Sequence, residues 1–162
     1  MLEGKVALIT GAAKGIGRAI ALAMAAEKAT VVINYNGSKE RAEQVLEEVK
    51  ALGADGCVYQ CNVADTADTD AMIKEIIKTY GHLDILVNNA GITRDNLIMK
   101  MSEEDFDAVI NANLKGCFNT IKAVSRQDHQ YYFCIRYPWK CRTGQLFCIQ
   151  SRNHRSYQNY GP

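Results

Sequence analysis

The sequence predicts an α/β fold built around a doubly wound parallel sheet, and three observations support this prediction. Short apolar runs rich in β-branched residues alternate with longer stretches of helical periodicity. These runs are apolar along most of their length, which is typical of strands that helices cover on both faces. A glycine-rich segment links the first run to the first helical stretch. Strands that alternate with helices form βαβ units, whose right-handed crossovers place helices on both sides of one sheet.

The first elements are a strand, a helix and a second strand. Lys5–Thr10 is a nearly continuous apolar run, which predicts a buried strand. The glycine-rich segment Gly11–Gly17 follows it and leads into Arg18–Glu27, a helical stretch rich in alanine. Thr30–Tyr35 is rich in β-branched residues and predicts the second strand.

A helix, a third strand and a third helix come next. Ser38 is a residue type that caps helices, and the helix that it begins is predicted to run to about Leu52 and stop at Gly53. Gly56–Val63 predicts the third strand. Asp65–Tyr80 carries apolar residues on one face and is followed by a glycine, so it predicts the third helix.

A fourth strand and one long helix complete the orderly part of the chain. Asp84–Asn88 is the fourth strand. Ser102 is the expected start of the last helix, and Asp105 gives that helix an acidic first turn that suits its dipole. This helix is predicted to continue as far as Val124.

The loop after the first strand predicts a site for phosphate groups. Gly11 permits a tight turn, Gly15 lets the backbone approach a pyrophosphate, and Gly17 lets the helix pack close to the sheet. The helix N-terminus then offers N–H groups and partial positive charge to the phosphates. A strand before these glycines and a helix after them make the context specific. The predicted cofactor-binding residues of this loop are Gly11, Ala12, Ala13, Lys14, Gly15, Ile16 and Gly17.

The end of the second strand indicates which nicotinamide cofactor the site prefers. An acidic residue there binds the adenosine 2′-hydroxyl and repels a 2′-phosphate. This chain has Asn34, Tyr35 and Asn36 instead, and Lys14 can reach a 2′-phosphate from the loop. The sequence therefore favours NADP(H), with Tyr35 among the cofactor-binding residues. The alternative is that Lys14 is simply solvated.

Four motifs in order resemble those of the short-chain dehydrogenase/reductase family. They are the spacing TGxxxGxG, the pair Asn62-Val63 at the end of the third strand, Asn88-Asn89-Ala90-Gly91 after the fourth, and Asn113 in the last helix. The resemblance covers residues 1 to about 127 and implies a Rossmann domain that binds NADP. It implies that Asn62 and Val63 flank the adenine, that Asn89, Ala90 and Gly91 contact the cofactor, and that Asn113 is the catalytic asparagine.

Within the family, Gly91–Met101 is similar to the segment found in 3-oxoacyl-acyl-carrier-protein reductases. This resemblance implies the NADPH-dependent reduction of a 3-oxoacyl thioester on acyl carrier protein, a step of fatty acid synthesis. It also implies a homotetramer, in which the helix through Phe106–Val124 takes part in dimerisation. Such enzymes use a tyrosine as general acid, a lysine four residues later and a serine, while the asparagine holds a water of the proton relay.

The character of the sequence changes between Gln127 and Asp128. Residues 1–127 hold 14 basic and 17 acidic residues, whereas residues 128–162 hold five basic residues and one acid. Eight of the 13 aromatic residues and both prolines also fall in residues 128–162. We therefore assign residues 1–127 to the NADP-binding domain and residues 128–162 to a tail of foreign composition, which leaves the predicted sheet incomplete on its C-terminal side.

The tail lacks the expected catalytic residues. No tyrosine in residues 128–162 is followed four residues later by a lysine, and no strand ending in serine is predicted there. We hypothesise a shift of reading frame after Gln127, because discarding the first base of the Asp128 codon permits a translation with the strand, the serine and the Tyr-x-x-x-Lys. On this reading the chain is inactive, and the alternatives are a nucleotide-binding remnant or another short-chain reductase.

Other readings of the tail remain open but are less favoured. Cys134, Cys141, Cys148 and His154 could form a zinc site, although their spacing lacks a close cysteine pair. Arginines among aromatic residues could bind single-stranded nucleic acid. A disordered or aggregation-prone tail is the default expectation.

Composition also bears on the partners, the location and the metal content that we expect. The net charge of +1 gives no global attraction to nucleic acid or membranes. No apolar run is long enough to span a bilayer, and the start of the chain is unlike a signal peptide. The six cysteines are therefore expected to be reduced thiols of a cytoplasmic protein. Asp65, Asp68 and Asp70 are interpreted as an acidic helix start, so no metal site is predicted.

Overall fold

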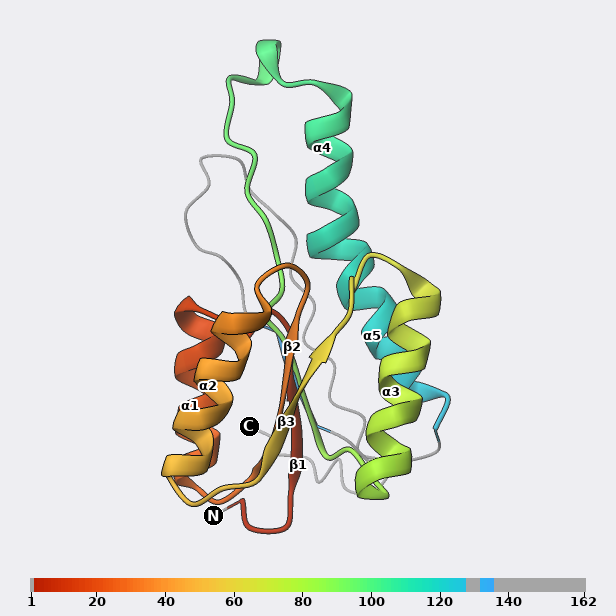
Figure 1. Ribbon diagram of the computed structural model, residues 1–162. Helices are drawn as coiled ribbons and strands as arrows, with labels where there is room; N and C mark the ends of the chain where they lie inside the picture. Colours follow the sequence, from red (N-terminus) through yellow and green to blue (C-terminus); the bar gives the residue numbers. More distant parts are fainter. Residues whose placement is uncertain (1, 128–131, 136–162) are drawn as a thin grey trace, which may run out of the picture.

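Parallel strands form one twisted sheet in the order β3-β2-β1-β4-β5, as the prediction of a doubly wound sheet requires (Figure 1). The computed structural model describes residues 2–127 and 132–135. The strands in these ranges are β1 (Val6–Ile9), β2 (Thr30–Tyr35), β3 (Gly56–Gln60), β4 (Ile85–Asn88) and β5 (Tyr132–Ile135). The helices are α1 (Gly15–Ala26), α2 (Lys39–Ala51), α3 (Thr66–Tyr80), α4 (Glu103–Ile110) and α5 (Gly116–Ser125).

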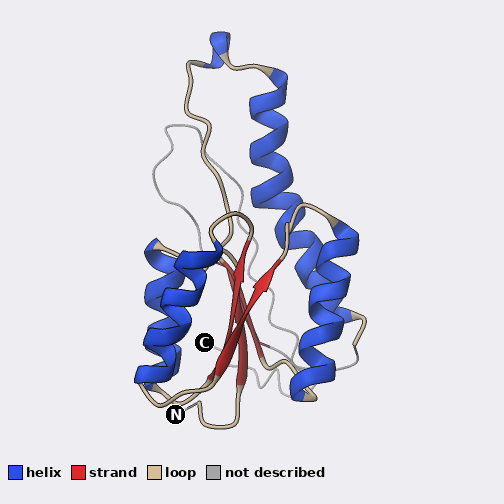
Figure 2. Cartoon of the chain, in the orientation of Figure 1, coloured by secondary structure: helices blue, strands red, loops and turns tan. Residues whose placement is uncertain are grey.

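Helices cover both faces of the sheet (Figure 2). Helices α1 and α2 lie on one face, where Ala21, Val45 and Ile33 belong to one buried cluster. Helices α3 and α5 lie on the other, where Ile73, Leu86 and Val124 belong to a second. Strands β1, β2 and β4 therefore contribute side chains to two cores, which explains why their sequences are apolar rather than alternating.

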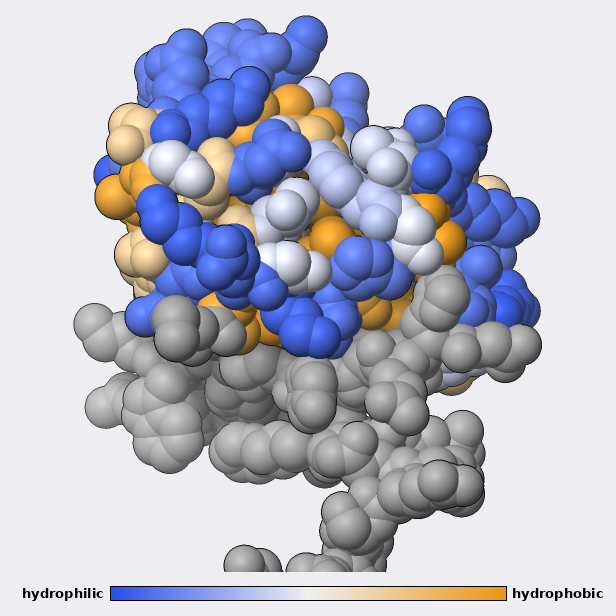
Figure 3. All heavy atoms as spheres, turned by 90° about the horizontal axis from the view of Figure 1, so that it is seen from below, coloured by the Kyte–Doolittle hydropathy of each residue, from blue (hydrophilic) through white to orange (hydrophobic). Residues whose placement is uncertain are grey.

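The two ends of the sheet differ in what they present. The loops at the carboxyl ends of the strands gather above the sheet in Figure 1, beside the projecting helix α4. The opposite end is seen in Figure 3, where hydrophilic side chains of the described residues are interspersed with smaller hydrophobic areas. In doubly wound folds ligands bind at the carboxyl ends of the strands, so the first of these ends is the place to look for a site.

The residues that precede α2, α3 and α4 differ in whether their side chains cap the helix. The Asp65 side chain accepts hydrogen bonds from the amides of Ala67 (2.7 Å) and Asp68 (3.0 Å) at the start of α3. Ser102 accepts one from the amide of Asp105 (3.1 Å) at the start of α4. Ser38 occupies the corresponding place before α2, but its side chain makes no capping hydrogen bond, so the prediction for Ser38 was wrong in that respect.

The last helix is interrupted, which the sequence did not predict. Helix α4 ends at Ile110, a π-helical turn spans Asn111–Lys115, and α5 begins at Gly116. Apolar periodicity continues across this turn, so the sequence alone predicts one uninterrupted helix. The interruption coincides with Asn113, whose side chain is hydrogen-bonded outside the helix. Single π turns of this kind occur frequently at functional sites.

One segment of the tail joins the sheet. Tyr132–Ile135 pairs in parallel with β4, with Ile85 opposite Tyr132 and Asn88 opposite Ile135. The default expectation for the tail is a disordered or aggregation-prone segment, whereas aromatic and β-branched residues such as these favour strands. The other features expected of the tail fall on residues 128–131 and 136–162 or on the side chains of β5, which lie outside the described residues. The division of the chain at residue 127 therefore remains a prediction.

Candidate dinucleotide-binding site

A cavity of about 590 Å³ opens at the carboxyl ends of the central strands. The strand order reverses between β1 and β4, because the chain builds β1, β2 and β3 outward and then returns to the other side of β1. This switch point is where doubly wound folds bind ligands. The predicted residues that line the cavity are Gly11, Ala13, Lys14, Gly15, Ile16, Tyr35, Asn62, Val63, Asn89, Ala90 and Gly91. Ala12, Gly17 and Asn113 are not part of this lining.

The glycines of the loop have the conformations and clearances that a phosphate cradle needs. Gly11 and Gly15 have φ angles of +63° and +58°, which residues with a side chain rarely adopt. A Cβ atom on Gly15 would meet nothing within 4 Å, so the backbone there is open to the cavity. A Cβ atom on Gly17 would lie 2.7 Å from the carbonyl oxygen of Gly11 and closer still to the Asn89 side chain. Gly17 therefore permits the close packing that supports the loop from behind.

Thr10 and Asn89 join the two loops that face each other across the switch point. The Thr10 hydroxyl oxygen accepts hydrogen bonds from the amides of Asn89 (3.0 Å) and Ala90 (2.9 Å). The Asn89 side chain donates in return to the carbonyls of Thr10 (2.8 Å) and Gly11 (3.1 Å). The sequence indicated Asn89 but not Thr10, whose buried hydroxyl also donates to the carbonyl of Val87 in β4 at 3.3 Å.

Asn34 lines the cavity, and its side chain is hydrogen-bonded to the backbone around the site. Its side chain is 1% exposed, and its oxygen accepts a hydrogen bond from the amide of Gly11 at 3.2 Å. Its nitrogen donates to the carbonyls of Tyr35 (3.4 Å), Tyr59 (3.4 Å) and Cys61 (3.1 Å). An acid here would lose these donor bonds, so the absence of an acid at residue 34 also has a structural cause.

The cavity is lined by positive but not by negative side chains. Lys14 and Arg41 both border it, from the glycine loop and from α2. None of the described residues that line it is Asp or Glu. We missed Arg41, because its role depends on how α2 packs and the sequence shows only a basic residue on an exposed helix face. Two cations and no acid suit a ligand with phosphate groups.

The catalytic asparagine expected from the resemblance lies in the π turn. Asn113 Oδ1 accepts a hydrogen bond from the amide of Ile92 at 2.8 Å, and its Nδ2 donates to the carbonyl of Ile92 at 3.0 Å. A Cβ atom on Gly91 would lie 3.0 Å from Asn113 Oδ1, so a larger residue would crowd this contact. Asn113 thus fixes the loop after β4, while its neighbour Ala112 borders the cavity.

Thiols near the site are held in their neutral form. Burial raises the pKa of Cys61 to about 11, and the hydrogen bond with Thr69 offsets this only in part. Burial also raises the pKa of the Cys117 thiol. A cysteine acts as a nucleophile through its thiolate, so neither residue is activated at neutral pH. Within the ranges that the structure describes, no three His, Cys, Asp or Glu side chains gather in a way that could hold a metal ion.

Comparison with known proteins agrees with this geometry. A family model described as short chain dehydrogenase matches residues 5–131. The chain belongs to the short chain dehydrogenase family. The 3-oxoacyl-[acyl-carrier-protein] reductase FabG of Staphylococcus aureus (strain N315) is 57% identical over 123 residues, which cover 76% of this chain and 50% of the relative. The reductase of the same name from Thermotoga maritima is 49% identical over 150 residues, which cover 93% of this chain and 56% of the relative.

Solved structures of the family have the same fold as this chain. A short chain dehydrogenase from Mycobacterium avium superposes with a TM-score of 0.77 at 38% identity, covering 83% of this chain and 53% of that one. A short chain dehydrogenase from Burkholderia cenocepacia J2315, solved in complex with NADP, gives a TM-score of 0.77 at 36% identity, covering 82% and 55%. The chain thus spans about half the length of the family members that it matches. Among the described residues, no helix combines the length and apolar character needed to cross a membrane.

Proposed function

We propose that this chain carries the NADP(H)-binding half of a 3-oxoacyl-acyl-carrier-protein reductase. The observation that carries the cofactor proposal is the cavity at the switch point, which combines an open glycine loop with Lys14 and Arg41 and has no acidic lining residue in the described ranges. An ammonium and a guanidinium suit the extra phosphate of NADP, which an acid would repel. When bound, NADPH supplies the hydride that reduces a ketone carbon.

The substrate class rests on the names of the relatives. The two reductases compared above act, by name, on 3-oxoacyl groups carried by acyl carrier protein. We extend that substrate to this chain, with Asn62 and Val63 beside the adenine, Asn89, Ala90 and Gly91 at the cofactor, and Asn113 in the proton relay. A cytoplasmic location is part of this proposal.

We further propose that the chain itself does not complete the reaction. Reduction needs a positioned general acid, which typically contributes about 10²–10⁴-fold to the rate. Residues 128–162 contain no Tyr-x-x-x-Lys. The same spacing occurs at Tyr35 and Lys39, but Tyr35 is 6% exposed at the end of β2, whereas the resemblance implies a catalytic tyrosine after residue 127. The second candidate function is therefore nucleotide binding without catalysis.

Two measurements separate the candidates. Fluorescence titration should show that the chain binds NADPH more tightly than NADH, and equal affinity or no binding would contradict the cofactor proposal. NADPH oxidation in the presence of an acetoacetyl thioester should stay at background, and robust turnover would instead establish the reductase activity. Resequencing the gene around the codons for Gln127 and Asp128 tests the proposed frame shift directly.

Exposed apolar side chains on α4, the π turn and α5 bear on how the chain assembles. Phe106, Leu114 and Phe118 are 53%, 52% and 58% exposed along α4, the π turn and α5. Large apolar side chains exposed in a row on one helical arm favour contact with another protein surface. We propose that a second copy of the chain covers them, as the homotetramer implied by the family resemblance requires.

A further inference from the structure

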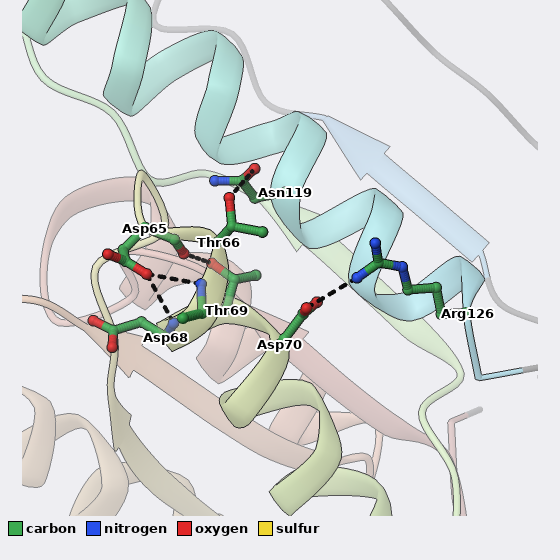
Figure 4. Close-up of polar contacts among 8 residues, drawn as sticks. Asp65, Thr66, Asp68, Thr69, Asp70, Asn119 and Arg126 are labelled. Atoms are coloured by element: carbon green, nitrogen blue, oxygen red, sulfur yellow. Dashed lines mark hydrogen bonds and ion pairs between the residues drawn. The ribbon is translucent and has the colours of Figure 1, made fainter.

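The loop after β3 contacts the side chain of Asn119 from α5, which Figure 4 shows beside Thr66 at the start of α3. Asn119 is 2% exposed, and its Nδ2 donates hydrogen bonds to the carbonyls of Val63 (2.9 Å) and Ala64 (3.2 Å). Its Oδ1 accepts one from the hydroxyl of Thr66 at 3.2 Å. A single buried amide therefore engages three groups on the chain that leads from β3 into α3.

Gly116 brings α5 close enough for this contact. A Cβ atom at residue 116 would lie 2.7 Å from Cγ2 of Val63. A side chain there would force either Val63 or α5 to shift. Gly116 and Asn119 are three residues apart and so share one face of the helix. That face is shaped to receive Val63.

The loop after β3 borders the cavity on one side of the switch point. Its residues Asn62 and Val63 line the cavity, together with residues of β2, Lys14 and Arg41. A dinucleotide whose pyrophosphate lies at Gly11–Gly17 extends one nucleoside over each half of the sheet. The half with β2 and β3 carries the cations that suit the 2′-phosphate, so the loop faces the adenosine end of the ligand.

We propose that Asn119 is a positioning residue that fixes the Asn62–Ala64 loop for the adenosine half of the dinucleotide. This inference rests on the proposed cofactor. Asn119 does not line the cavity and acts only through the loop. Its two donor bonds use the carbonyls of Val63 and Ala64, which orients the Val63 side chain. Removing the donors would take a hydrogen bond from both carbonyls and leave Val63 only the longer one from the Thr69 hydroxyl (3.3 Å), so the loop would rearrange to reach water.

Asn119→Asp is the sharpest test, because it keeps the size and the acceptor for Thr66 but removes both donors. The matched control is Arg126→Gln, which breaks the ion pair of Arg126 with Asp70 (2.9 Å) at the other end of the same α3–α5 contact (Figure 4). The full chain is titrated with three probes: NADPH, adenosine 2′,5′-bisphosphate, and reduced nicotinamide mononucleotide, which has no adenosine.

We expect Asn119→Asp to bind NADPH and adenosine 2′,5′-bisphosphate about tenfold more weakly, as the loss of a buried hydrogen bond implies. Affinity for the mononucleotide should stay within about twofold, and the control should match the wild type for all probes. Equal losses for the three probes would show a general loss of structure and would overturn the positioning role. No loss for the adenosine probes would overturn it as well.

Amide hydrogen exchange examines the loop without any ligand. The Asp65 amide donates to the carbonyl of Asn62 at 2.9 Å and reports whether the loop is closed. We expect it to exchange at least about tenfold faster in Asn119→Asp but not in Arg126→Gln. If the wild type bound none of the probes, the cofactor proposal would fail, and an unchanged exchange rate at Asp65 would separately overturn the role of Asn119.

Discussion

Asn34 and Gly11 are joined by a hydrogen bond in which the Gly11 amide donates to the Asn34 side-chain oxygen at 3.2 Å. The bond connects the end of β2 to the turn of the glycine loop. Because the same side chain also donates to backbone carbonyls of β2, of β3 and of the segment after β3, one residue links the glycine loop to both of these strands. Asn34 therefore supports both the shape of the cavity and the stability of the fold.

Asn34→Asp should destabilise the chain, because aspartate keeps the acceptor for Gly11 but cannot donate to the carbonyls. We expect a loss of about 1–3 kcal/mol in the free energy of unfolding, measured by urea denaturation. Asn36→Asp is the control, since residue 36 is exposed. That variant should change stability by less than about 0.5 kcal/mol, while weakening NADPH binding because its acid repels a 2′-phosphate. Equal stability of the two variants would contradict the structural role of Asn34.

Replacing the two cations of the cavity should change cofactor preference. Lys14→Gln and Arg41→Gln are each expected to weaken NADPH binding about five- to tenfold, because each removes a charged hydrogen bond to a partly exposed phosphate. NADH has no 2′-phosphate, so its affinity should remain within about twofold. Titrations of each variant with NADPH and with NADH, at low and at high salt, measure these changes in affinity. A parallel loss for NADH would place these side chains at the pyrophosphate instead.

Gly17→Ala should be costly, whereas Gly37→Ala should not. The new methyl group at residue 17 would lie 2.7 Å from the carbonyl oxygen of Gly11, whereas at residue 37 it would meet nothing within 4 Å. Crowding of this kind typically costs about 1–3 kcal/mol. Thermal unfolding of both variants, followed by circular dichroism, compares them directly. If the two melted alike, α1 would have room to move away from the loop.

Low pH should destabilise the fold because it protonates Asp84. Burial raises the pKa of this carboxyl, but hydrogen bonds from the Val6 amide and Lys5, with the charges of Lys5 and His82, outweigh burial and hold it below its usual value. Its contribution to stability is therefore complete above the unfolded-state pKa of about 3.9 and is lost as the pH falls through the lower folded-state pKa. The stability difference between wild type and Asp84→Asn should narrow over that range in urea denaturation. In Lys5→Gln the loss should begin at higher pH.

Phe118→Glu tests the proposed assembly. A charge in a covered apolar surface is costly, so we expect the variant to sediment as a smaller species than the wild type in analytical ultracentrifugation. Lys78→Glu is the control, because Lys78 is 79% exposed on α3. A wild type that is already monomeric, or a variant that still assembles, would remove this surface from the interface.

The sequence predicted the backbone framework of the site well. The strand at Thr30–Tyr35 has the predicted bounds, and the glycine loop has the predicted open turn. These features depend on local chemistry, since β-branched runs and glycine turns show their conformational preferences within a few residues. The loop residues Asn62 and Asn89 were located because motif spacing places them at the ends of strands.

The remaining parts of the site depend on contacts that no local pattern shows. Arg41 reaches the cavity only because α2 packs beside β2, and Asn119 acts on residues more than 50 positions earlier. The π turn contains Asn113, which pairs with the backbone of Ile92, whereas the sequence of the turn continues the helical periodicity. Such features become visible only when the sheet has brought distant segments together.

The contact between Thr10 and Asn89 also makes ligand binding a measure of folding. These residues are 79 positions apart, so the site forms only when β4 has docked beside β1. A ligand that needs both loops binds the folded chain alone, and at about 100 times its dissociation constant it would add about 2.7 kcal/mol to stability. Retention on a nucleotide column would therefore select those molecules in which the central sheet is assembled.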